Sequence, residues 1–151
     1  MATDFEEIVA NGLTFVFENN PDHVEETEEL KKRFKVIIPE LERYFSDKDY
    51  FDRRKIQIEK SKNTILVYII KPFDESHTGS IGISEDSHII IELYPISRYN
   101  DIRQRFMFIQ TFVHEIFHLF FEDEIIVREK TVEFVKSNRY LNNLWMEALY
   151  E

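Results

Sequence analysis

Residues 101–121 read DIRQRFMFIQTFVHEIFHLFF, and this stretch decides how the rest of the chain is interpreted. Apolar side chains fill most of its positions, which predicts one long helix from Asp101 to Phe121. A helix that is apolar on all sides is buried inside a protein. Its length of about 21 residues is marginal for a membrane span, and charged residues interrupt it, so we expect a core helix.

This helix contains the sequence His114-Glu115-Ile116-Phe117-His118, in which two histidines and one glutamate interrupt the apolar run. Residues four apart lie on one face of a helix, so both histidines can bind one zinc ion at about 2.0–2.1 Å. Glu115 lies about 100° round the helix axis, where it can reach a bound water and act as a general base. Zinc lowers the pKa of that water, which prepares it to attack a peptide carbonyl. The alternative is an ordinary His–Glu–His stripe that faces solvent.

A catalytic zinc site usually has three protein ligands and one open position. The chain has no Cys and no His after His118, so we expect the third ligand to be an acidic residue. Our choice is Glu129, eleven residues beyond His118, because that spacing allows one more helical turn, a tight corner and a return. Glu133 lies one turn later on the same face and is the second choice.

Three acidic residues closer to the histidines remain as candidates: Glu122, Asp123 and Glu124. Glu122 would continue the same helix, so it could bind the ion only with strain. Glu124 would lie in the turn, which leaves little chain to fold back. We therefore rank both below Glu129.

A small mixed or antiparallel sheet of three to five strands is expected ahead of the apolar helix. Short β-prone stretches separated by turn signals predict its strands. The predicted strands are Leu13–Glu18 (or the end of a short helix), Lys55–Lys60, Thr64–Lys71, Gly79–Ser84 and Ser87–Tyr94. Ser61-Lys62-Asn63 predicts a hairpin turn after the second of them.

Helical spacing of apolar residues predicts three further helices. The first runs from about Val24 to Phe45, where Pro39 predicts a kink or a division into two helices. The others run from about Glu124 to Asn138 and from about Tyr140 to Leu149. Together these elements predict an α+β fold with one domain over residues 1–151, in which the sheet packs on the apolar helix.

The composition limits the classes of function. The net charge of −10 over 151 residues argues against a nucleic-acid partner. Residues 1–10 lack the basic and apolar regions of a signal peptide, so we expect a cytoplasmic protein without membrane association. We expect a monomer or weak dimer.

The segment HEIFH, followed by the acidic helix VREKTVEFV, resembles the gluzincin branch of zinc metallopeptidases, and the single small domain resembles the minigluzincins. The resemblance implies a zincin-like fold and a zinc endopeptidase that acts on a peptide or protein substrate. It implies that His114, His118 and, in our choice, Glu129 bind zinc, and that Glu115 is the general base. The alternative is a non-catalytic domain of this fold that binds a metal or a partner.

The same resemblance bears on two flanking segments. It implies that the strand before the active-site helix, Ser87–Tyr94, is an outer strand that pairs with an extended substrate. The alternative is an ordinary internal strand. It also implies that the tail Tyr140–Glu151 could block the cleft, and the alternative there is an amphipathic helix packed on the core.

Overall fold

The computed structural model describes residues 5–10, 12–46, 55–71, 77–95 and 99–150. Five strands form one mixed sheet, in the order β1-β2-β3-β5-β4. The strands are β1 (Phe5–Ala10), β2 (Leu13–Glu18), β3 (Thr64–Ile69), β4 (Gly79–Ile83) and β5 (Ile89–Leu93). The helices are η1 (Pro21–His23), α1 (Val24–Ser46), α2 (Lys55–Lys60), α3 (Asp101–Phe117), α4 (Glu124–Ser137) and α5 (Arg139–Leu149).

The sheet has a parallel centre and antiparallel edges. β2 pairs in parallel with β3, and β3 with β5, whereas β1 and β4 run antiparallel to their neighbours. The predicted mixed α+β sheet is therefore confirmed. β5 lies inside the sheet between β3 and β4, so the expectation that Ser87–Tyr94 supplies the outer strand is wrong. Among the described strands, the outer strand beside α3 is β4.

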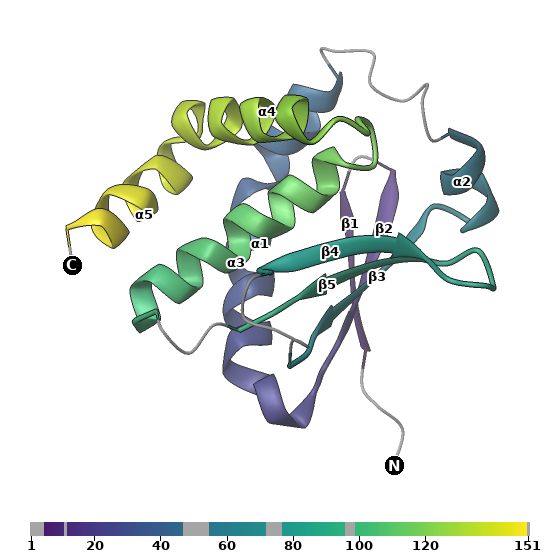
Figure 1. The fold of residues 1–151 in the computed structure, drawn as a ribbon, viewed down its shortest axis with the longest axis horizontal. Coiled ribbons are helices and arrows are strands. Elements are labelled where there is room, and N and C mark those ends of the chain that lie inside the picture. Colours follow the sequence, from purple (N-terminus) through teal and green to yellow (C-terminus); the bar gives the residue numbers. More distant parts are fainter. Residues whose placement is uncertain (1–4, 11, 47–54, 72–76, 96–98, 151) are drawn as a thin grey trace.

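The core lies between one face of the sheet and the helices. Figure 1 shows α1 and α3 against the sheet, with α4 and α5 beyond them. Four phenylalanine rings join β2, α1 and α3, with centroids 4.8–6.0 Å apart and mostly edge-to-face: Phe15, Phe17, Phe34 and Phe112. Such aromatic contacts add to the stabilisation from apolar burial. They also hold α3 in a fixed position against the sheet.

The N-terminal half differs from the sequence-based expectations in three places. Pro39 lies inside α1, which is a single helix, so the division into two helices that Pro39 suggested is wrong. Lys55–Lys60 forms the helix α2 and not a strand. Lys62 and Asn63 follow it with φ values of 58° and 57°, the left-handed conformation that ends helices. β1 was not predicted.

The long apolar helix also ends earlier than predicted. α3 stops at Phe117, and the chain turns over residues 118–120 before α4 begins. Leu119 and Phe120 are fully buried, and the Phe120 ring lies 4.4 Å from that of Phe45 in α1. Apolar residues that suggest a longer helix therefore anchor a turn. In the part of the chain that the structure describes, no helix combines the length and apolar character needed to cross a bilayer.

Candidate metal centre

Two histidines at the end of α3 face one carboxylate at the start of α4. Nε2 of His114 lies 3.0 Å from Oε1 of Glu124, and Nε2 of His118 lies 2.8 Å from Oε2 of the same residue. The two imidazole rings are 4.9 Å apart between centroids. Among the described residues, these three form a group whose ligand atoms all lie within 4.8 Å of one another.

The position of Glu124 follows from how α4 begins. Asp123 is the N-cap, and its Oδ1 accepts hydrogen bonds from the backbone N–H groups of Ile125 and Ile126 at 2.8 and 3.2 Å. Asp is a preferred N-cap because it satisfies backbone donors that have no partner within the helix. The cap makes Glu124 the first helical residue, directly after the turn that reverses the chain. Its side chain therefore reaches back to the last turn of α3.

The structure brings Glu124 to the histidines and leaves Glu129, our choice from the sequence, elsewhere. Glu129 is an exposed residue of α4, and Glu122 is exposed in the turn. Glu133 accepts a hydrogen bond from the hydroxyl of Tyr44 at 3.2 Å and pairs with Lys130 at 3.8 Å. The physical reason is that α3 ends at Phe117, earlier than predicted. The chain therefore turns directly after His118, and the carboxylate that faces the two histidines comes from the first turn of α4.

The hydrogen bonds of His118 test whether a cation fits here. Nδ1 of His118 lies 3.2 Å from the carbonyl oxygen of Phe121, which can only accept, so Nδ1 carries the proton of this bond. In a neutral ring Nε2 then presents a lone pair, and it faces a carboxylate oxygen at 2.8 Å. Two acceptors at this distance need a positive charge between them, either a second proton on the ring or a metal ion. A backbone carbonyl on the other nitrogen is also a usual partner of metal-binding histidines.

The three ligand groups lie close enough to hold one tetrahedral ion once their side chains adjust. Ligands that lie about 2.0–2.1 Å from zinc in a tetrahedral site are roughly 3.3 Å from one another. The two nitrogen–oxygen distances, 3.0 and 2.8 Å, end on different oxygens of Glu124, and one ligand atom from each of the three residues lies within 4.8 Å of the others. The side chains must therefore shift before all three bind one ion. Rotation of the Glu124 side chain, which is 49% exposed, can supply that change.

Glu115 is the second chemically unusual group of the site. It is buried, with 6% of its surface exposed, although it carries a carboxyl group. Burial, with a smaller contribution from the charge of Glu124, raises the pKa of Glu115 to about 7. Burial also lowers the pKa of His114, and this outweighs the opposite influence of Glu124. A neutral imidazole is the form that binds metals.

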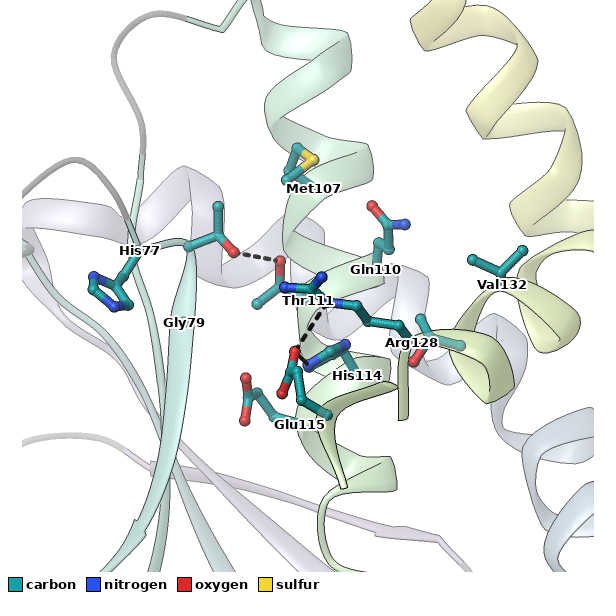
Figure 2. Close-up of a pocket in the computed structure, with 12 residues that line it drawn as sticks. His77, Gly79, Met107, Gln110, Thr111, His114, Glu115, Arg128 and Val132 are labelled. Carbon is teal, nitrogen blue, oxygen red and sulfur yellow. Dashed lines mark hydrogen bonds and ion pairs between the residues drawn. The ribbon is translucent and has the colours of Figure 1, made fainter. Parts of the chain in front are cut away.

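A cavity of about 610 Å³ opens over these residues. It lies between the start of β4 and the helices α3 and α4. Figure 2 shows His114, Glu115 and Arg128 close together, with Gly79 of β4 on one side and Val132 of α4 on the other. The lining residues are His77, Thr78, Gly79, Met107, Gln110, Thr111, His114, Glu115, Glu124, Arg128, Thr131 and Val132.

The wall between β4 and α3 is tightly packed. Oγ1 of Thr111 lies 3.3 Å from Oγ1 of Thr78, just before β4. A Cβ atom added at Gly79 would lie 2.6 Å from the Thr111 methyl group and 2.9 Å from the backbone oxygen of Glu92. The absence of a side chain at Gly79 therefore lets β4 approach α3, which brings the edge of the sheet to the cavity.

Several lining residues were not identified from the sequence. Met107, Gln110 and Thr111 precede His114 by seven, four and three residues, which is the spacing of one helix face. That spacing could have identified them. Arg128, whose Nε lies 3.3 Å from Oε1 of Glu124, has no such signal because its place depends on the turn.

Comparison of the chain with models of protein families, with curated proteins and with solved structures found no match. The function is therefore inferred from the geometry of the site.

Proposed function

We propose that this chain is a zinc-dependent peptidase in which His114, His118 and Glu124 bind the metal ion. The observation that carries the proposal is the convergence of two imidazole nitrogens on one carboxylate, within 3.0 Å, at the edge of a cavity. Two histidines and one glutamate, with one open position, are the donor set of a class of catalytic zinc sites. A zinc ion bound there supplies a Lewis acid that polarises a carbonyl oxygen and lowers the pKa of water.

Glu115 is proposed as the general base. A water molecule that donates a hydrogen bond to its carboxylate loses a proton to it as the water oxygen attacks the peptide carbonyl carbon. The protonated Glu115 then donates that proton to the amide nitrogen as the carbon–nitrogen bond breaks. A group that both accepts and returns a proton works best with a pKa near the working pH, and burial raises that of Glu115 to about 7.

The edge strand β4 is proposed to align the substrate. Among the described strands β4 pairs only with β5, so the backbone groups on its other side are available for an additional strand. An extended peptide can add to such an edge through main-chain hydrogen bonds. Because Thr78 and Gly79 line the cavity that contains Glu115, a peptide on this edge would pass in front of the carboxylate. The sequence assigned this task to β5, which lies one strand further in.

One observation favours a second function, that of a non-catalytic domain. Glu124 already interacts with His114, His118 and Arg128, whose Nε is 3.3 Å away. These contacts could join α3 to α4 without an ion and without catalysis. In that case the cavity would serve only for binding.

Metal analysis combined with a cleavage assay distinguishes these functions. The full chain is purified without chelator, its bound zinc is measured, and it is incubated with a mixture of peptides of defined sequence. We expect about one zinc per chain, together with cleavage that chelation abolishes and added zinc restores. The variant His114→Ala should lose both properties. Bound zinc without cleavage of any peptide would exclude the peptidase and leave a domain that only binds the metal. A chain that never binds zinc would also exclude the peptidase, and it would support the non-catalytic domain in which Glu124 joins the two helices without an ion.

A further inference from the structure

A second, smaller cavity of about 230 Å³ lies between α3 and α5. Figure 1 shows α5 on the same side of α3 as α4, and residues of α3 and α5 are in contact. The lining residues are Tyr99, Arg103, Phe106, Met107, Gln110, Trp145, Ala148 and Leu149. The tail that could have blocked the cleft packs as the helix α5 through Leu141, Leu144 and Ala148, and it forms one wall of this cavity.

The two cavities lie next to each other along α3. Met107 and Gln110 line both of them. Gln110 lies one turn before His114, and Met107 lies about two turns before it, so the same face of α3 forms the floor of both cavities. A peptide that lies along this face of α3 could therefore place different residues in the two cavities.

The smaller cavity is suited to one apolar side chain. Phe106, which lines the cavity, is buried with 5% of its surface exposed. Trp145, Ala148 and Leu149 form a largely apolar wall. Arg103 is the one charged residue of the lining, and its Nε donates to the carbonyl oxygen of Ala148 at 3.2 Å. Pockets for whole small-molecule ligands measure about 300–1,000 Å³, and this cavity is below that range. Its volume therefore fits a single large side chain of a longer ligand.

We infer that the cavity between α3 and α5 is a specificity subsite that takes a large apolar residue, such as Phe or Leu, of a bound peptide. The inference rests on the proposed function, because it takes the larger cavity as a peptide-binding cleft. An α-helix rises about 1.5 Å per residue, so Gln110 and Met107 lie roughly 6 and 10 Å before His114 along α3. An extended peptide advances about 3.3 Å per residue. The apolar residue is therefore two or three positions from the peptide bond that lies at Glu115.

Trp145 allows a direct binding test, because it is the single Trp of the chain. The full chain carrying Glu115→Gln is titrated with a capped octapeptide of Ala and Ser in which one residue is Phe, and Trp emission is recorded. The same peptide with Ala in place of Phe is the control. Burial of one large apolar side chain predicts about ten- to hundredfold tighter binding of the Phe peptide, with a saturable change in emission. Equal affinity of the two peptides would overturn the inference.

Variants of α5 test where the side chain binds, with the affinity measured through a fluorescent label on the peptide. Trp145→Ala should weaken binding of the Phe peptide about tenfold. Leu149→Ala, at a half-exposed position that the fold tolerates, should weaken it in the same direction. Met146→Ala is the matched control, because Met146 is exposed on α5 and lines neither cavity. A control that weakens binding as much as Trp145→Ala, or two cavity variants that bind like wild type, would refute the subsite.

The register of cleavage separates this inference from the proposed function. In peptides with Phe at successive positions, the wild-type chain should cleave at a constant offset of two or three residues from Phe. Cleavage at sites that do not depend on the position of Phe would refute the subsite but remain consistent with the proposed peptidase. Absence of cleavage with retained selectivity for the Phe peptide would overturn the peptidase and leave the apolar subsite intact.

Discussion

Oε2 of Glu124 lies 2.8 Å from Nε2 of His118, across a turn of five intervening residues. Two features of the local fold produce this contact. α3 ends at Phe117, and Asp123 caps the next helix so that Glu124 is its first residue. The group that we propose as a metal site is therefore built across a helix corner, with ligands from the last turn of one helix and the first residue of the next.

The two candidate carboxylates of α4 should differ in their effect on metal binding. Glu124→Gln removes a proposed ligand, and loss of groups that only support a ligand already costs about 10–100-fold in affinity. We expect the affinity for zinc to fall by about 100-fold or more, as measured by competition with a chelating dye. Glu129→Gln is the matched control on the same helix and should bind zinc like wild type. Equal losses in the two variants would argue against the proposed ligand set.

Replacement of Glu115 should separate catalysis from metal binding. Glu115→Gln keeps the size of the side chain and removes its ability to accept a proton. General-base catalysis contributes about 10²–10⁴-fold, so kcat/KM for peptide cleavage should fall by about that factor. The zinc content should remain that of wild type. A variant with undiminished cleavage would exclude Glu115 as the base.

The buried carboxyl group of Glu115 should make the stability of the metal-free protein depend on pH. Its pKa is raised from 4.5 to about 7 in the folded state, so the folded chain holds a proton that the unfolded chain has lost between these values. The free energy of unfolding therefore falls as pH rises from about 4.5 to 7 and then levels off.

The variant Glu115→Gln isolates this contribution. We expect the free energy of unfolding of this variant to exceed that of wild type by about 3 kcal/mol at pH 8, and by little at pH 4, in urea unfolding of chelator-treated protein. Glu129→Gln should show no such difference between the two pH values. If the difference in the free energy of unfolding between Glu115→Gln and wild type did not change with pH, the Glu115 carboxyl group would not be desolvated as described.

Two glycines of β4 provide a matched test of the contact between the sheet edge and α3. Gly79→Ala places a methyl group 2.6 Å from the side chain of Thr111 and 2.9 Å from the backbone oxygen of Glu92, whereas Gly82→Ala meets nothing within 4 Å. Overpacking of this kind costs about 1–3 kcal/mol, so urea unfolding should show that loss for Gly79→Ala. Gly82→Ala should stay within about 1 kcal/mol of wild type. Equal stability of the two variants would contradict the close approach of β4.

The sequence predicted the elements whose hydrophobic pattern is long or strong. α1, α3, α4 and α5 appear near their expected places, as do β3, β4 and β5. β1 was missed because its residues FEEIVA carry two adjacent acids and bury only Ile8 and Ala10. Lys55–Lys60 (KIQIEK) alternates like a strand, but Lys, Gln and Glu are good helix formers, and the segment is a helix.

Within the candidate site, the spacing of His114, Glu115 and His118 could be interpreted from helix geometry alone. The position of the third carboxylate could not, because it depends on where α3 ends. Leu119 and Phe120 continue the apolar run, and nothing local distinguishes a buried turn from one more helical turn. A usable signal was Asp123, since assigning it as an N-cap makes Glu124 the first residue of the next helix.

If the proposed site binds an ion, the corner between α3 and α4 would couple that binding to the folding equilibrium. A ligand that binds only the folded chain increases the free energy of unfolding by RT ln(1 + [L]/Kd), about 2.7 kcal/mol at a free concentration of 100 times Kd. An ion at His114, His118 and Glu124 would cross-link the end of α3 to the start of α4, which are otherwise joined by a short turn. The free concentration of the ion would then set how often this corner opens, and removal of the ion would expose Leu119 and Phe120 before the rest of the core.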